Sequence, residues 1–203
     1  DSVSITITQP DVLAASISTI ANTSCFDTCD GSATVTITGG TSPYNVLWGD
    51  GQVTTTAVDL CDGGVSVDVT DTNGCVITAG GTITEPALIV LSTVDTNISC
   101  AGGNDGSIDL TMTGGTMPYT YNWSNTDTTE DVSNLTFGTY QLIATDANGC
   151  QDSITVSLTE ELPLVLTTSN VDAHCGQSDG SASVGVAGGV TPYTYTWDDP
   201  GAQ

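Results

Sequence analysis

The sequence repeats itself with a period near 75 residues, and this repeat constrains the fold more than any other feature. Three segments align almost position for position: CDGSATVTITGGTSPYNVLW, NDGSIDLTMTGGTMPYTYNW and SDGSASVGVAGGVTPYTYTW, which end at Trp48, Trp123 and Trp197. Two sets of cysteines follow the same period, Cys25, Cys100 and Cys175 in one set and Cys75 and Cys150 in the other. Such self-similarity predicts an array of equivalent modules.

Matching segments at the module ends set the predicted boundaries. TITEP around Glu85 matches SLTEE around Glu160, and TITQP near Gln9 is the equivalent tail of a preceding copy. The predicted divisions are 1–10, the last strand of a preceding module; 11–85 and 86–160, two complete modules; and 161–203, the N-terminal part of a further module. The chain begins with Asp1 and no signal-like segment, so we expect mature or internal sequence.

Apolar residues alternate with other residues along much of the chain, which predicts β-strands. Clear examples are Ala33, Val35 and Ile37, then Tyr44, Val46 and Trp48, and later Val65, Val67 and Val69. The turn signals DG, GG-x-x-P and NG separate the runs. About six short strands per module, with a Trp on the third, predict an all-β fold of tandem immunoglobulin-like β-sandwich modules. We expect Trp48, Trp123 and Trp197 in the cores, and the closely joined modules in an extended array.

Cysteines missing from the second module indicate how the others pair. Asn104 occupies the place of Cys29 and Thr136 the place of Cys61, so that module has lost both members of one pair. Cys29 is therefore predicted to bond to Cys61. The remaining predictions are Cys25 with Cys75, Cys100 with Cys150, and Cys175 with a partner beyond the last residue.

A zinc site is the alternative for these cysteines. Cys25, Cys29, Cys61 and Cys75 supply the right number of ligands, but the second module would keep only two of them while retaining the rest of its pattern. Structural disulfides are favoured, because small secreted modules use them to supplement a small core. They indicate an oxidising compartment and predict a secreted, extracellular protein.

The charge of the chain excludes several classes of partner. It has no Lys or Arg against 24 Asp and Glu, which gives a formal net charge of −24. Phosphates and anionic lipid head groups find no cationic side chain on such an acidic surface. We therefore expect no nucleic-acid partner. The longest apolar run, ALIVL, is too short for a membrane span.

No catalytic arrangement recurs along the repeat, although the function of an array should recur in each copy. The single histidine, His174, aligns with Ser24 and Ser99. No Ser-His-Asp or Cys-His set can be assembled, and nothing marks two carboxylates as facing each other across a cleft. The sequence predicts no catalytic residues and no enzyme activity.

Calcium is the one cofactor for which the residues offer a physical case. If the disulfides form within modules, the DG turn of each module is drawn towards its D-x-N-G turn, and oxygen ligands suit Ca²⁺. The candidate ligands are Asp30, Asp71 and Asn73 in the first module and Asp105, Asp146 and Asn148 in the second. The alternative is that these sequences form turns and bind no metal.

The ordered motifs C-x(3,4)-DGS, GG-x-x-PY, TD-x-NGC and TEP resemble the SprB repeat over residues 11–203. That repeat occurs in very large surface adhesins of gliding Bacteroidetes and in related secreted proteins. The resemblance implies a cell-surface protein exported through the type IX secretion system. It also implies tandem modules that hold an adhesive region away from the cell, in surface adhesion and gliding motility.

Two other functions remain open beside this structural stalk. In a carbohydrate-binding module array, exposed aromatic rings of each module would grip surface polysaccharide or other cells. In an extracellular filament or sheath, the modules would associate laterally. Most Tyr and Trp residues lie at positions predicted to face a core, which favours the structural stalk over the carbohydrate-binding array. The partners expected for the modules of a stalk are the neighbouring modules of the same chain.

Overall fold

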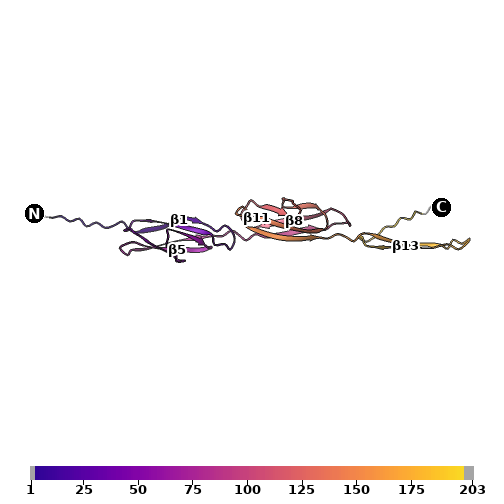
Figure 1. The fold of residues 1–203 in the computed structure, drawn as a ribbon, viewed down its shortest axis with the longest axis horizontal. Coiled ribbons are helices and arrows are strands. Elements are labelled where there is room, and N and C mark those ends of the chain that lie inside the picture. Colours follow the sequence, from indigo (N-terminus) through magenta and orange to yellow (C-terminus); the bar gives the residue numbers. More distant parts are fainter. Residues whose placement is uncertain (1–2, 199–203) are drawn as a thin grey trace. The chain divides into compact units, whose positions relative to one another are not determined.

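The computed structural model describes residues 3–198, which contain strands and turns and no helix (Figure 1). The first repeat holds β1 (Ala14–Ala21), β2 (Gly31–Thr38), β3 (Asn45–Trp48), β4 (Thr56–Leu60), β5 (Gly63–Thr70) and β6 (Val76–Ile83). The second holds β7 (Val90–Thr96), β8 (Gly106–Thr113), β9 (Thr120–Trp123), β10 (Val132–Leu135), β11 (Gly138–Thr145) and β12 (Gln151–Leu158). The third holds β13 (Val165–Val171) and β14 (Ser181–Ala187). The predicted all-β class is confirmed.

Each of the first two repeats consists of two three-stranded sheets. Their strand orders are β1-β2-β4 with β3-β5-β6 in the first repeat, and β7-β8-β10 with β9-β11-β12 in the second. The same strands therefore pair in both copies, as the sequence repeat requires. This arrangement is the predicted immunoglobulin-like sandwich, with strands three and four of each repeat in different sheets.

Alternating side chains of the strands fill the core of each sandwich. Val67 and Val69 on β5 are fully buried, and Trp48 is 2% exposed. The Trp48 indole Nε1 donates a hydrogen bond of 2.8 Å to the Thr54 carbonyl, so its polar atom is satisfied inside the core. Trp123 is likewise 2% exposed and donates to the Thr129 carbonyl at 3.0 Å.

The polypeptide chain enters the sandwich of the first repeat at one end and leaves it at the opposite end. β1 and β6 finish side by side, because the Thr23 amide donates to the Thr84 carbonyl at 3.1 Å. β4 is antiparallel to β2, and β3 is antiparallel to β5, so β3 and β4 both run in the direction of β1 and β6. Because β3 and β4 follow each other in the same direction, the chain crosses the length of the sandwich five times. We call the end with residues 22–30 the exit end, and the end with residues 39–44 and 71–75 the entry end.

Cα proximity divides the chain into two compact units. Among the described residues, one consists of 3–90, 112–119 and 145–152, and the other of 91–111, 120–144 and 153–198. Two turn segments of the second repeat therefore group with the first repeat. Compared with the predicted boundary between residues 85 and 86, the first unit additionally contains residues 86–90 and these two turn segments.

The chain ends depart from the sequence predictions. Residues 3–10, predicted as a strand, form none, because their equivalent β6 pairs with β5 and no described strand pairs with residues 3–10. Trp197 was predicted to be buried and is 57% exposed. The described part of the third repeat supplies one two-stranded sheet, β13–β14, and a second sheet is needed to cover a tryptophan on both faces. Residues 1–2 and 199–203 lie outside the described residues.

Candidate functional site at the Cys25–Cys150 disulfide

The loop between β1 and β2, residues 22–30, is held in shape by its own polar groups, and we call it the Ser-Cys loop. The Ser24 amide donates to Asp30 Oδ1 at 2.8 Å, and the Thr28 hydroxyl donates to the Cys25 carbonyl at 2.7 Å. Asp27 has a φ of 55°, and its amide donates to Glu85 Oε2 at 2.7 Å. The loop is thereby fastened to the end of β6 and presents Cys25 at the exit end.

Hydrogen bonds from Ser24 also set the charge state of the loop. The Ser24 hydroxyl and amide both stabilise the ionised form of Asp30, and they hold the pKa of that carboxyl below its ordinary value. Asp105 occupies the same place in the second repeat, where the Ser99 hydroxyl and amide lower its pKa in the same way. In each loop, hydrogen bonds from the loop's own serine thus favour the ionised carboxylate.

A second element of the site is the turn at residues 146–150, which we call the D-x-N-G-C turn. Asp146 is 5% exposed, and its Oδ1 accepts the amides of Asn148 and Cys150, each at 2.9 Å. Its Oδ2 accepts the Thr116 amide at 2.8 Å. Gly149 has a φ of 88°, a conformation that glycine adopts without a Cβ clash. The sequence thus dictates a rigid turn that presents both Asn148 and Cys150.

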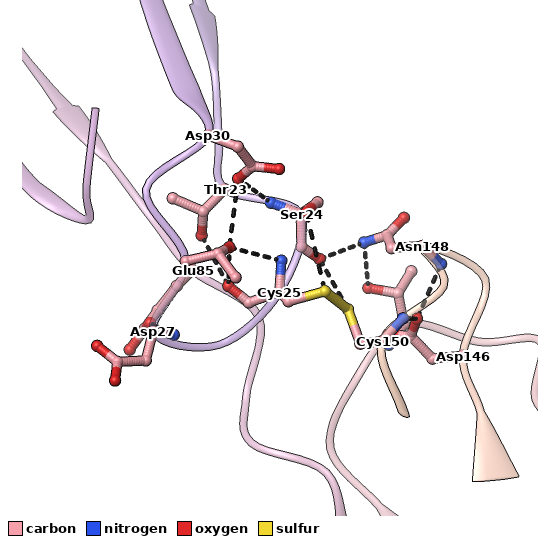
Figure 2. The surroundings of a disulfide bond; sticks show 11 residues. Thr23, Ser24, Cys25, Asp27, Asp30, Glu85, Asp146, Asn148 and Cys150 are labelled. Atoms are coloured by element: carbon pink, nitrogen blue, oxygen red, sulfur yellow. Dashed lines mark hydrogen bonds between the residues drawn. A yellow bond between two sulfur atoms is a disulfide. The ribbon is translucent and has the colours of Figure 1, made fainter. Parts of the chain in front are cut away.

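The Ser-Cys loop of the first repeat and the D-x-N-G-C turn of the second are joined covalently. Cys25 forms a disulfide with Cys150, 125 residues later (Figure 2). Beside it, the Asn148 side-chain amide donates to the Ser24 carbonyl at 2.8 Å. All four residues belong to the same compact unit. A bond that closes a loop of this length stabilises by about 5 kcal/mol in the chain-entropy model.

The predicted pairings of Cys25 with Cys75 and of Cys100 with Cys150 are wrong. Cys75 precedes β6 at the entry end, whereas Cys25 lies at the exit end where β6 finishes. The eight residues of β6 span roughly 26 Å, far beyond the Cα separation of about 7 Å that a disulfide permits. The Cys29–Cys61 bond is present as predicted. Cys75, Cys100 and Cys175 are exposed free thiols.

A pocket of about 380 Å³ adjoins the Cys25–Cys150 bond. Its walls include Pro86, Leu88, Ile89 and Gly115, and the side of the first repeat contributes Cys25 and Phe26. Gly115 has a φ of 60°, and a Cβ there would lie 2.9 Å from both Ile89 and Asp146. Only glycine therefore allows the GG-x-x-P loop to approach the D-x-N-G-C turn this closely.

The calcium candidates of the first repeat are occupied by hydrogen bonds of the chain itself. Asp71 Oδ1 accepts the amides of Asn73 and Cys75, each at 2.9 Å, and its Oδ2 accepts the Thr41 amide at 3.0 Å. These donors, that of Cys75 first, hold the pKa of Asp71 below its ordinary value. Asp30 is bonded within its own loop at the opposite end of the sandwich.

The second repeat follows the same pattern. Asp146 and Asn148 lie together in the D-x-N-G-C turn, and Asp105 is hydrogen-bonded to Ser99 in its own Ser-Cys loop. Within residues 3–198, no three His, Cys, Asp or Glu side chains lie close enough together to hold a metal ion. The turn chemistry of these residues accounts for the contacts that they make. Calcium binding remains an untested expectation for them.

The sequence repeat, the duplicated sandwich and the recurring loops agree with the family comparison. The model of the SprB repeat matches residues 17–53, 92–128 and 167–202, which together make up more than half of the chain. The chain belongs to the SprB repeat family. Each match of the SprB model includes one Ser-Cys loop or its equivalent and one GG-x-x-P loop.

Solved structures of low sequence identity resemble this SprB repeat chain only in part. The two-domain Ig1-Ig2 segment of Dpr2, in a complex with DIP-Theta, is 11% identical with a TM-score of 0.31, over 77% of this chain and 73% of that one. A tetra-tandem repeat from the extending region of a large adhesion protein is 16% identical, with a TM-score of 0.27 over 86% and 62%. Domains 4–9 of the surface layer protein SbsC are 14% identical, with a TM-score of 0.26 over 84% and 36%.

No curated protein matches the SprB repeat chain. Among its described residues, no helix has the length and apolar character needed to cross a membrane.

Proposed function

We propose that this chain is a structural segment of a large secreted cell-surface adhesin, in which SprB repeats act as a spacer between the cell and an adhesive region. The observation that carries the proposal is the Cys25–Cys150 bond, which staples one repeat to the next. A protein whose repeats are cross-linked at the junction resists extension and proteolysis, as a spacer at the cell surface requires. Extracellular location agrees with the two disulfides, which persist in oxidising surroundings.

The features that recur between copies support a mechanical function over a catalytic one. The buried Trp, the Ser-Cys loop and the D-x-N-G-C turn are present in both complete repeats, and each serves folding or joining. The exposed rings of the complete repeats do not recur. Phe26 aligns with Ala101, and Phe137 aligns with Asp62, so no exposed ring is shared by the two copies, and the tyrosines that do recur, Tyr44 and Tyr119, are half-buried. These observations favour the spacer over the carbohydrate-binding array.

The test is an in-frame deletion of one full period, residues 86–160, from the protein on its native cells. The deletion removes Cys150, the partner of Cys25, and restores the period, because Cys175 then follows Cys25 at the distance that Cys100 did. Display, adhesion and gliding are expected to persist at nearly wild-type levels, because a spacer loses only length and one of its cross-links. A matched control removes residues 86–140, which breaks the period and leaves a second sandwich without β7 to β10, and is expected to reduce display. Loss of adhesion with normal display of the full-period deletion would assign the binding site to this segment.

A further inference from the structure

The Cys25–Cys150 bond shortens the covalent path along the chain. Its two cysteines are separated by 125 positions in the sequence, yet their Cα atoms lie 5.8 Å apart. The loop that the bond closes contains ten strands of the two complete repeats, from β2 to β11. In these repeats, only β1 before Cys25 and β12 after Cys150 lie outside the loop. A pull applied on both sides of the bond therefore acts on a covalent path that leaves out most of both sandwiches.

The two strands outside the loop are already extended. β1 pairs with β2 from Ala14 to Ala21, and β12 follows directly after Cys150 and spans eight residues. A β-strand rises about 3.3 Å per residue, and a fully stretched chain reaches at most about 3.6 Å per residue. Pulling on β1 or β12 therefore adds only about a tenth to the length of the strand. While the bond is intact, neither strand holds folded length that a pull could release.

Hydrogen bonds fasten each of these two strands to the other sheet of its sandwich. In the first repeat, the Thr23 amide after β1 donates to the Thr84 carbonyl after β6 at 3.1 Å. In the second repeat, the Ile98 amide after β7 donates to the Thr159 carbonyl after β12 at 2.9 Å. β1 and β6 belong to different sheets, and so do β7 and β12. The strand that would carry a pull is thus held by the whole sandwich in both repeats.

The surroundings of the Cys25–Cys150 bond protect it from exchange with thiols. Its cysteines are half-buried, whereas those of the Cys29–Cys61 bond are exposed. Exchange begins when a thiolate anion attacks a sulfur. Asp146 accepts the amide of Cys150, and Glu85 accepts an amide of the Ser-Cys loop, so two carboxylates lie near the bond and repel that anion (Figure 2). The chain also has no Lys or Arg to stabilise a departing thiolate. We therefore expect thiols to reduce the Cys25–Cys150 bond more slowly than the Cys29–Cys61 bond.

We propose that the Cys25–Cys150 disulfide is a load-bearing cross-link, through which tension passes from β1 to β12 while residues 26–149 are shielded from it. Force favours an unfolded state only in proportion to the length that unfolding adds. Unfolding of residues 26–149 adds none while the bond is intact, so both sandwiches keep their fold under forces that unfold an unlinked sandwich. The inference rests on the proposed spacer function for its use at the cell surface, where a spacer is pulled from both sides.

The experiment stretches single molecules of the full chain between handles on its two ends, after non-reducing peptide mapping has verified both disulfides. For the oxidised chain, we expect no unfolding step larger than about 80 Å, the length held in residues 165–187 of the third repeat. A dithiol is then added to the stretched molecule. It reduces each disulfide to two thiols and is itself oxidised to a cyclic disulfide. The reduced chain should release about 440 Å in all from the loop that the Cys25–Cys150 bond had closed.

Variants of the two disulfides give the matched comparison. Cys25→Ser with Cys150→Ser removes the cross-link, and this oxidised variant should unfold in two large steps, about 100 Å from the first sandwich and about 210 Å from the second. The first step is shorter because the Cys29–Cys61 bond withholds a loop with a sequence separation of 32. Cys29→Ser with Cys61→Ser is the control and should behave as the wild-type chain, because that bond lies inside the shielded loop. All four substitutions together should lengthen the first step to about 210 Å.

Disulfides within the repeats would give a different record. The dithiol would then release two separate lengths of about 170 Å each, and this result would overturn the proposal. So would a step of about 100 or 210 Å in the oxidised wild-type chain, or a wild-type record from the variant without Cys25 and Cys150. If that variant does not fold, the dithiol measurement on the wild-type chain still decides. The deletion of residues 86–160 measures adhesion and display, so a failure of the spacer function there would leave the force measurement unaffected.

Discussion

The side-chain amide of Asn148 donates a hydrogen bond to the carbonyl of Ser24, 124 residues earlier in the chain, at a distance of 2.8 Å (Figure 2). The bond lies beside the Cys25–Cys150 disulfide and orients the two backbones that the disulfide joins. Because Asp146 holds the turn through three backbone amides, Asn148 is presented for this contact by local structure alone. The D-x-N-G-C motif is therefore both a turn and a recognition surface for the Ser-Cys loop.

Replacing Asn148 tests this role of the turn. Asn148→Leu is expected to lower the free energy of unfolding by about 1 kcal/mol, the typical value of one hydrogen bond. Asn73→Leu is the matched control, because Asn73 has the same turn and the same contact to the preceding GG-x-x-P loop, while within residues 3–198 it makes no hydrogen bond to a Ser-Cys loop like that of Asn148. Denaturant unfolding of both variants gives the measurement. Equal losses would assign the effect of Asn148 to the turn and not to Ser24.

Removing the disulfide between repeats is expected to have a larger effect. Cys25→Ser combined with Cys150→Ser should lower the free energy of unfolding by about 2 to 5 kcal/mol, because the unfolded chain regains the freedom of a long loop. Cys75→Ser combined with Cys100→Ser changes two exposed thiols and should leave the stability of the monomer unchanged. Thermal and denaturant unfolding compare the two double variants. A large loss of stability in the Cys75→Ser and Cys100→Ser double variant, with little loss in the other, would favour disulfides within repeats.

Acid should destabilise the first repeat through Asp71. Its pKa is held below the ordinary value of 3.8 by hydrogen bonds from backbone amides, chiefly that of Cys75. Because the folded pKa is lower than the unfolded one, the unfolded state takes up the proton first as the pH falls. The stability from Asp71 is therefore complete above the ordinary value and decreases as the pH falls through the folded pKa. Asp71→Asn should flatten the pH dependence of the melting temperature in this window, and Asp62→Asn, at an exposed position, should not.

Much of the fold could be predicted because every strand in it appears twice. Period-two alternation marks β2, β3 and β5, and the repeat excludes a helix at VLAASISTIA, part of which forms β1. The Cys29–Cys61 pair could be deduced because both of its members are absent from the second repeat. These predictions depend only on the position of a residue within its repeat, and a sequence alignment of the repeats gives that position.

The partner of Cys25 could not be predicted by the same reasoning. By elimination, the repeat alignment indicates that an equivalent of Cys75 bonds an equivalent of Cys25, but it does not show which copies are involved. The path of the chain decides which copies are bonded. Strand β6 begins next to Cys75 and ends beside the loop that carries Cys25, so the full length of β6 separates the two cysteines. The signal available in the sequence was the length of β6, since eight extended residues separate the two cysteines too widely.

Tryptophan substitutions distinguish the complete repeats from the third. Trp48→Ala is expected to lower the free energy of unfolding by about 3 to 5 kcal/mol, because it leaves a cavity in a filled core and an unbonded Thr54 carbonyl. Trp197→Ala should change it by less than about 0.5 kcal/mol, because that side chain is exposed. Denaturant unfolding with proteolysis as a second readout compares the two. A large effect at Trp197 would indicate that the third repeat buries it.

The second repeat should accept the disulfide that it lacks. Its strands pair in the register of the first repeat, with Leu135 opposite Gly106 where the first has Leu60 opposite Gly31. Asn104→Cys with Thr136→Cys would therefore place two cysteines in the positions of Cys29 and Cys61. We expect the bond to form during oxidative folding and to raise the free energy of unfolding by about 2 to 4 kcal/mol. Each single substitution is the control, and a double variant that retains two free thiols after oxidation would show that the two repeats differ at this corner. Tyr140 offers the specific reason for such a difference, since its hydroxyl donates to the Thr136 carbonyl at 2.9 Å in a repeat without that bond.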